Sequence, residues 1–445
     1  MITIDTDYIQ QMSMQLANYE VQGALARLER NEASYKAQLD ALGKLRSALT
    51  TFSSELRKLK SGGSSMLVNS ARFSQEGYAT ATVSPKASAG RYQFFVEQLA
   101  SAHQIALAGS QLQSQAEDGK TLTIALGTED SKQFQLSITL DSGLYDENGE
   151  LSLQRLAAAI NDHADNKGIK AAVLRSGGDT YLLLTSEESG ADNRIWIDGD
   201  AAAGVETREL SPAQDAIVHA GSGAERIELR SSSNRFDNII DGVSITFSKV
   251  YAEGEVPLVV DIARDDDAIR NKVQSFVDAF NALKSSFDSL TASGGENSAR
   301  GGLAGDSSIR AIENQLNALL RAEYGTEKNR LAAYGIVADR NGRLTIDSSR
   351  LEAAIAEDPA AFDQLFTGKD NLLDSIDKLV SRYTSSANGM LTNRMDSLNQ
   401  GLRRLDREFE AIQRQYDNYY NRYLRQFTAM MQAMQAIQQT HGLFG

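Results

Sequence analysis

The chain has 445 residues, of which 41% are hydrophobic and 23% charged, with 45 basic and 59 acidic side chains. This length suits about three domains, and the net charge of −14 disfavours binding to nucleic acid phosphates. Cysteine is absent, which excludes thiolate catalysis, cysteine-ligated zinc and disulfide bonds. Met1–Asp7 lacks the features of a signal peptide, and no window approaches ~18 consecutive apolar residues, so we expect no membrane insertion.

The N-terminal end shows the apolar spacing of a long helix. All four prolines lie between Pro85 and Pro359, so both ends of the chain lack this helix-breaking residue. We expect a helical stem over residues 1–65 that ends at Ser61–Ser65. Ile9, Met12, Leu16 and Tyr19 are expected to continue its apolar face upstream. The predicted helix-pairing residues of this segment are Leu39, Leu42, Leu49 and Phe52.

The C-terminal segment 391–445 predicts a second long helix, over 395–440. Its apolar residues alternate steps of four and three from Leu398 to Tyr423, and one extra step of four then leads to Phe427. The predicted pairing and partner-contact residues are Leu402, Leu405, Phe409, Ile412, Tyr416, Tyr423, Phe427, Met430, Met434 and Ile437. Because such stripes are unstable in water, the terminal helices should pair with each other, with further copies or with a partner.

The middle of the chain predicts strands. Strand-like alternation occurs at 78–83, 91–96, 134–140, 181–185 and 194–197, and a short helix is expected over 153–161. Residues 242–247 and 258–262 are interpreted as paired strands, and 267–290 as a helix. A hairpin is predicted around Asn341-Gly342, followed by a helix that Asp347 caps.

These elements predict an α+β multidomain fold, in which long terminal helices form a coiled-coil stem and nested β-rich domains lie between them. Beside the two stem segments we expect a β-rich domain of 66–110 plus 205–265. An inserted α+β domain should occupy 111–204, and a helical and β-hairpin domain over 266–390 should pack on the stem.

A search for catalytic motifs finds none. The four histidines, His103, His163, His219 and His441, lack metal-ligand spacing, and Gly119-Lys120-Thr121 lacks the first glycine of a phosphate-binding loop. Asp265–Asp267 is interpreted as the start of a helix. Arginines among the C-terminal tyrosines can indicate single-stranded nucleic acid binding, but the tyrosines fall on the apolar stripe and favour helix pairing. We therefore expect no catalytic residue, metal or cofactor.

Several motifs, in order along the chain, resemble those of the flagellar hook-associated protein 2 or filament-cap family (FliD). They include Phe95–His103, Ala213–Ala216, Ile240–Thr246, Gly302–Asp306 and Gly342–Asp347, followed by Asp358-Pro359 and Leu365–Gly368. The N-terminal segments Tyr35–Leu39 and Leu45–Leu49 are similar to the family's first helix.

The resemblance implies a secreted protein at the extracellular tip of the bacterial flagellum, exported through the flagellar type III channel. It implies a ring of roughly five or six copies that promotes insertion and folding of flagellin and prevents its loss. Hook–filament junction proteins and a cytosolic export chaperone are the other implied partners. The alternatives are a hook–filament junction protein, a minor flagellin or a surface adhesin; an enzyme is not expected.

Overall fold

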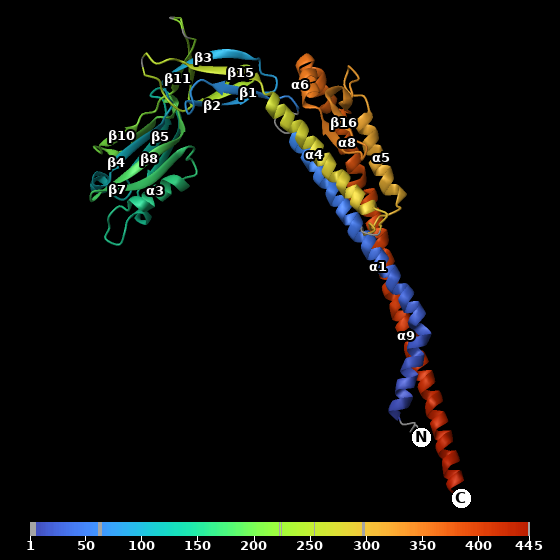
Figure 1. The fold of residues 1–445 in the computed structure, drawn as a ribbon. Helices are drawn as coiled ribbons and strands as arrows, with labels where there is room; N and C mark the ends of the chain where they lie inside the picture. The colour runs from blue at the N-terminus through green and yellow to red at the C-terminus, as the bar shows by residue number, and fades with distance from the viewer. Residues whose placement is uncertain are drawn as a thin grey trace. The chain divides into compact units, whose positions relative to one another are not determined.

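The computed structural model describes residues 6–60, 65–221, 223, 225–252, 254–295 and 299–443, with side chains up to Ile437 in the last helix. Most of the break predicted at Ser61–Ser65 lies outside these residues, as does the start of the chain. The chain forms two compact units, 1–66 with 266–445, and 67–265 (Figure 1). Long terminal helices with β-rich domains between them confirm the predicted fold class. The finer division into five segments stays a prediction.

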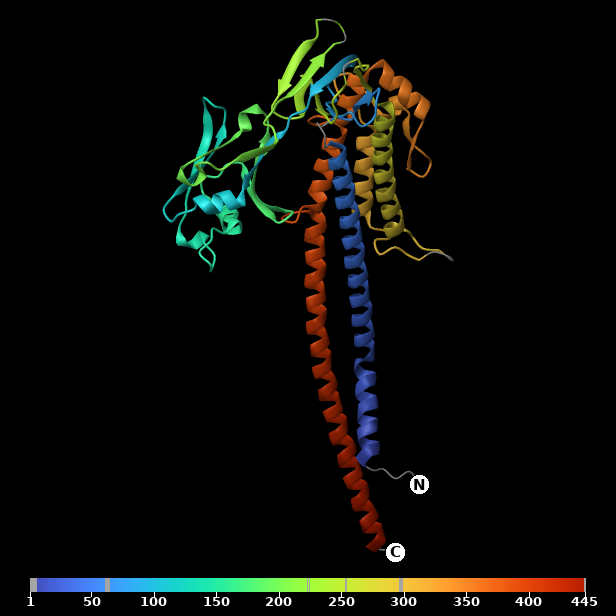
Figure 2. The ribbon, with the colours of Figure 1, turned by 90° about the vertical axis from the view of Figure 1, so that its left-hand side faces the viewer.

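The first unit contains the two long terminal helices, five shorter helices and one hairpin within the described residues. The helices are α1 (Thr6–Lys60), α4 (Asp266–Thr291), α5 (Ser307–Arg321), α6 (Ser348–Glu357), α7 (Pro359–Phe366), α8 (Leu372–Thr384) and α9 (Met390–Leu443). The strands are β16 (Ile336–Ala338) and β17 (Leu344–Ile346). In Figure 2, α1 and α9 run side by side over most of their length, and the start of α1 lies toward the same end of the stem as the end of α9.

An aromatic core holds the shorter helices of this unit together. Phe276 of α4 meets Phe366 of α7 edge to face, with ring centroids 5.7 Å apart. Phe362 contacts both Phe366 and Tyr334, at 5.2 and 5.3 Å. The helix predicted at 267–290 is thus α4, and its apolar stripe faces this core.

Local signals fix the ends of several elements. Gly342 has φ +75° in the predicted hairpin, and the Asp347 side chain accepts a hydrogen bond from the Arg350 amide at the start of α6. Asp306 caps α5 in the same way and pairs with Arg394 of α9. Partial burial opposes ionisation of Asp306, but hydrogen bonds from Arg394 and Ser308 outweigh it and lower its pKa to about 2.

The second unit contains a sandwich of two antiparallel sheets around one hydrophobic core. One sheet has the order β1-β15-β3-β11-β12 and the other β13-β14-β2. The strands are β1 (Asn69–Phe73), β2 (Ala79–Val83), β3 (Gly90–Gln98), β11 (Ala216–Ala220), β12 (Ile227–Ser231), β13 (Arg235–Ile240), β14 (Val243–Phe247) and β15 (Leu258–Arg264). Phe94 and Phe247 meet across the core at 5.7 Å.

The predicted pairing of 242–247 with 258–262 was wrong. These segments are β14 and β15, and they belong to the two different sheets of the sandwich. β14 pairs with β13 and β2, whereas β15 pairs with β1 and β3. Both segments alternate buried and less buried residues because each lines the same core from one side.

The rest of this unit is a second pair of antiparallel sheets with two helices. The sheets have the orders β10-β4-β8-β7 and β6-β5-β9. The elements are β4 (Ala102–Ala108), α2 (Gly109–Gln115), β5 (Thr121–Gly127), β6 (Lys132–Thr139), α3 (Leu153–Asp162), β7 (Ile169–Ser176), β8 (Asp179–Ser189), β9 (Ile195–Asp198) and β10 (Thr207–Ser211). β4 and β10 lie inside the ranges 66–110 and 205–265, which we predicted to form the β-rich domain. In the structure these two strands pair with each other, and β4 also pairs with β8, which belongs to the predicted inserted domain of 111–204.

Candidate functional site on the helical stem

The stem consists of α1 and α9, which pack against each other in antiparallel directions (Figure 1). We call Leu42–Lys60 the proximal part of α1 and Thr6–Arg30 its distal part. The proximal part buries large side chains, namely Leu42, Leu45, Leu49, Phe52, Leu56 and Leu59. It packs on α4 and α8 as well as on α9, and Phe52 meets Phe280 of α4 with ring centroids 6.2 Å apart.

The predicted pairing residues fall into three groups by burial. Those that are buried are Leu42, Leu49, Phe52 and Leu405. Those that are half-buried are Leu39, Leu402, Ile412, Tyr416, Tyr423 and Phe427. Those that are exposed are Phe409, Met430, Met434 and Ile437.

The distal part of α1 buries fewer large side chains than the proximal part. Its buried residues are Ile9, Ser13, Ala17, Val21 and Leu28, and the first four recur every four residues. Tyr19 is 78% exposed, so the expectation that it continues the apolar face was wrong. The spacing of large residues was misleading because small residues such as Ser13 and Ala17 let two helices approach closely.

A polar contact links the distal parts of the two helices. The Tyr423 hydroxyl donates to Oε1 of Glu20 over 2.6 Å, and Arg422 lies 3.5 Å from the same carboxylate. The Arg422 guanidinium also lies over the rings of Tyr419 and Tyr423, at 4.9 and 4.7 Å. The arginine and tyrosine pattern of α9 therefore serves the stem itself. Sequence reasoning missed Glu20, since nothing local relates it to Tyr423.

Gly401 is a second contact residue that the periodic pattern did not reveal. It is buried in α9, and a β-carbon there would lie 2.7 Å from Cε2 of Tyr35. The tyrosine ring thus occupies the space that a larger side chain would need. A glycine inside a long heptad pattern was the available signal.

One apolar surface of α9 remains uncovered by α1. Phe409, Met430, Met434 and Ile437 are 49%, 46%, 41% and 61% exposed, and we call these four residues the α9 strip. Met430, Met434 and Ile437 follow one another at steps of four and three, so they share one side of the helix, whereas Phe409 lies on an earlier turn, before the extra step between Tyr423 and Phe427. After Arg425 the sequence contains no aspartate, glutamate, lysine or arginine. An exposed, uncharged apolar strip of this kind is typical of a docking surface.

The described residues offer no comparable centre for chemistry. No group of three or more aspartate, glutamate or histidine residues among them is arranged to hold a metal ion. His103 is buried and bonded to neighbouring strands, and His219 lies 2.6 Å from Glu97 as a pair in a polar surface cavity. None of the described helices is both long enough and apolar enough to cross a membrane.

Comparison with known proteins identifies the family. Models described as the N-terminus and C-terminus of flagellar hook-associated protein 2 match residues 5–103 and 213–439. The lateral flagellar hook-associated protein 2 of Vibrio parahaemolyticus is 35% identical, over 97% of this chain and 98% of its own length. The A-type protein of Pseudomonas aeruginosa is 27% identical, over 94% and 90%.

The fold also resembles a solved structure. The crystal structure of the flagellar cap protein FliD from Escherichia coli, domains D1-D2-D3, superimposes with a TM-score of 0.64 and 25% identity. The match covers 81% of this chain and 99% of the Escherichia coli chain. The chain therefore belongs to the flagellar hook-associated protein 2 family, the filament-cap proteins at the extracellular tip of the bacterial flagellum.

Proposed function

We propose that this protein caps the growing filament by docking the distal stem on filament subunits, through the α9 strip. The observation that carries the proposal is the strip itself, which α1 leaves exposed on an otherwise paired helix. Full burial of a large apolar side chain stabilises a complex by roughly 1.5–3 kcal/mol. Since about half of each strip side chain is already covered, the four together would contribute on the order of 3–6 kcal/mol before entropy costs.

The residue types of the strip suit a changing partner. Two of the four are methionines, whose unbranched side chains adapt to different surfaces. The uncharged helix end adds no desolvation penalty for ionised groups when a partner helix covers it. A cap that must hold successive flagellin subunits needs contacts of this adaptable kind.

Family membership supports a proposal for the wider assembly. We infer a ring of roughly five or six copies that promotes insertion and folding of exported flagellin and prevents its loss. Hook–filament junction proteins would receive the first ring, and a cytosolic chaperone would cover the strip before export. In this role the protein acts by contacts and not by catalysis.

The proposal is tested by deleting the gene and complementing it with stem variants. Deletion should leave intact hooks, few filaments and abundant unpolymerised flagellin in the medium. Wild type should restore filaments, whereas a Phe427→Asp, Met430→Asp variant should not, because one charge within the strip and one beside it oppose its burial. The matched control is Gln426→Asp, Gln432→Asp, which adds the same charge at exposed polar positions of α9.

The readout is the filament length on cells together with flagellin in the supernatant. Circular dichroism of the purified variants checks that the stem still forms. Normal filaments with the Phe427→Asp, Met430→Asp variant would contradict the role of this surface. Normal filaments after deletion, in the flagellar system that the protein serves, would contradict capping itself.

The similarity values favour a lateral flagellar system as the one served. The lateral relative is 35% identical to this chain, against 27% for the A-type protein of Pseudomonas aeruginosa. We therefore expect the deletion to abolish swarming on surfaces and to leave swimming in liquid intact. Loss of swimming instead would assign the protein to a polar system.

A further inference from the structure

The sequence contains three Asn-Gly pairs, Asn148-Gly149, Asn341-Gly342 and Asn388-Gly389. Asparagine is chemically labile, above all before glycine, which has no side chain to hinder the reaction. The amide nitrogen of the glycine gives up its proton to water and attacks Cγ of the asparagine, and the side-chain nitrogen takes up a proton and leaves as ammonia. Water then opens the succinimide ring, and the product is aspartate or isoaspartate.

In the fold, all three glycine amides are held in hydrogen bonds. Each donates to a backbone carbonyl earlier in the chain, and the acceptors are those of Asp146, Asp339 and Ser385, at 3.1, 3.0 and 2.9 Å. An amide held in this way cannot turn toward the asparagine side chain, so the reaction requires the hydrogen bond to open first. The rate at each pair should therefore follow the ease with which its own segment opens.

Two of the pairs lie in turns of the same design. Both turns have the sequence Asp-x-Asn-Gly, and in both Oδ1 of the aspartate accepts the amides two and four residues later, over 2.8–2.9 Å. Gly149 and Gly342 have φ of +78° and +75°. Because the internal contacts of the two turns match, a difference in opening must come from what packs around them.

The turn at Gly342 rests on α4. A β-carbon at Gly342 would lie 3.1 Å from Cε of Lys284. Asn281 donates to the Leu344 carbonyl over 2.9 Å and accepts from the Leu344 amide over 2.8 Å, which fixes the chain just after the turn. Opening this turn would therefore disturb the packing of the hairpin on α4.

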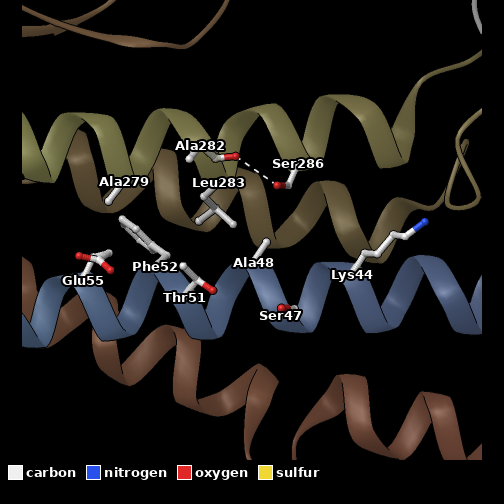
Figure 3. Close-up of a pocket in the computed structure, with 10 residues that line it drawn as sticks. All are labelled: Lys44, Ser47, Ala48, Thr51, Phe52, Glu55, Ala279, Ala282, Leu283 and Ser286. Carbon is white, nitrogen blue, oxygen red and sulfur yellow. Dashed lines mark hydrogen bonds between the residues drawn. The ribbon is translucent and has the colours of Figure 1, made fainter.

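The helix α4 is itself held firmly, because it packs on α1. Figure 3 shows Leu283 of α4 pointing toward α1, on the side where Phe52 points toward α4. Both side chains are buried, and the Phe52 ring also meets Phe280. The support behind the Gly342 turn is thus part of the core of the first unit.

The third pair is enclosed at the start of α9. Gly389 is buried, and a β-carbon there would overlap the carbonyl oxygen of Ser385. The Gly389 carbonyl accepts the Asn393 amide over 3.0 Å, and Ser385 Oγ donates to Oδ1 of Asn388 over 3.1 Å. Freeing the Gly389 amide would require the first turn of this helix to unravel.

The turn at Asn148 is the least supported of the three. Residues 146–150 are all exposed. Among the described residues, none but the chain neighbours of Gly149 has a heavy atom within 4 Å of the place a β-carbon there would take. Beyond its internal hydrogen bonds, the turn is closed by the bridge between Tyr145 and Leu151. Exposed loop tips of this kind open at low free energy.

We propose that Asn148 is a modification site of the native protein, which converts to aspartate or isoaspartate while Asn341 and Asn388 remain intact. The reaction adds a carboxylate close to that of Asp146. Isoaspartate also lengthens the backbone by one methylene group, so the Gly149 amide no longer reaches its acceptor in the original turn. The modified turn then stays open.

Peptide mass spectrometry of the full chain, incubated in mildly alkaline buffer, tests the assignment. Asn148 should deamidate at least about tenfold faster than Asn341 and Asn388, because loops open at much lower free energy than packed elements. In concentrated urea the three rates should converge, since the reacting dipeptide is the same. A native rate at Asn341 or Asn388 equal to that at Asn148 would overturn the proposal.

Two variants test whether opening of the turn sets the rate. Asp146→Ala removes the acceptor of two turn amides and should raise the rate at Asn148 alone. Asn281→Ala is the matched variant for the other turn, and it should raise the rate at Asn341 and leave Asn148 unchanged. Asn388 is the internal control, because general unfolding of the first unit would raise its rate as well. An unchanged rate at Asn148 in Asp146→Ala would overturn control by this turn.

Discussion

His103 of β4 joins three neighbouring strands, two through its buried ring and one through its backbone amide. Its Nδ1 accepts a hydrogen bond from the Ile195 amide of β9 at 2.8 Å, and its Nε2 lies 3.2 Å from Oε1 of Glu209 in β10. Its own amide donates to the Ser186 hydroxyl of β8. Because Nδ1 acts as an acceptor, the ring is neutral in this arrangement. Sequence reasoning placed His103 among isolated histidines and could not foresee partners some 90 residues away.

The first prediction is that His103 makes the second unit sensitive to acid. Burial lowers the pKa of His103 below its ordinary value of 6.5, and the bond with Glu209 only partly offsets this effect. The unfolded chain therefore binds the proton more readily, so stability should fall as the pH drops below 6.5 and level off below the folded pKa. Replacing His103 with leucine should remove this dependence. At pH 7 the variant should lose about 1–3 kcal/mol, because the Ile195 amide is left without an acceptor.

Urea unfolding of wild type and variant at pH 7 and pH 5 measures both effects. Glu209→Gln is the matched control, since it keeps a polar partner for Nε2 and retains the buried ring. It should stay sensitive to acid. An unchanged pH dependence in His103→Leu would show that other groups cause it.

At the scale of elements, the heptad pattern was enough to predict the two terminal helices. It was not enough to predict their register, that is, which residues of α1 lie beside which residues of α9. The alternation of steps of three and four holds over dozens of residues, which few structures other than long paired helices require. The register depends on Glu20 with Tyr423 and on Gly401 with Tyr35, pairs that lie far apart in sequence. In the second unit, β4 pairs with β10 about a hundred residues later, which strand propensity cannot indicate.

The second prediction is that the stem opens from its distal end. The distal part of α1 buries five side chains over 25 residues, among them the small Ser13 and Ala17, whereas the proximal part buries five leucines and Phe52 within 19 residues. Stabilisation scales with the apolar area removed from water. Amides of Thr6–Arg30 should therefore exchange with deuterium well before those of Leu42–Lys60, as measured by mass spectrometry of peptic peptides.

Two substitutions compare the parts of the helix directly. Leu49→Ala should lower the free energy of unfolding of the first unit by about 2–5 kcal/mol, because it leaves a cavity at a fully buried site. Val21→Ala removes less volume from the distal part and should mainly accelerate exchange in Thr6–Arg30. Uniform exchange along α1 would argue against this gradient.

At the scale of the whole molecule, the chain crosses between its two compact units only near Met66–Leu67 and Asp265–Asp266. Each unit has a hydrophobic interior of its own. Leu49 lies in the first, and Leu182 belongs to a core cluster of the second. Units with separate cores and short connections generally unfold separately.

The third prediction is therefore two unfolding transitions that respond to different substitutions. Leu49→Ala should shift only the transition of the first unit, and Leu182→Ala only that of the second, each by about 2–5 kcal/mol. Differential scanning calorimetry of the full chain measures both shifts, and the excised segment 67–265 should melt at the temperature of the transition that Leu182→Ala lowers. If both variants instead moved a single transition, the units would be coupled. Two separate transitions would instead mean that the units unfold independently, so that a cap can release its stem from one filament subunit while its β-rich unit stays folded.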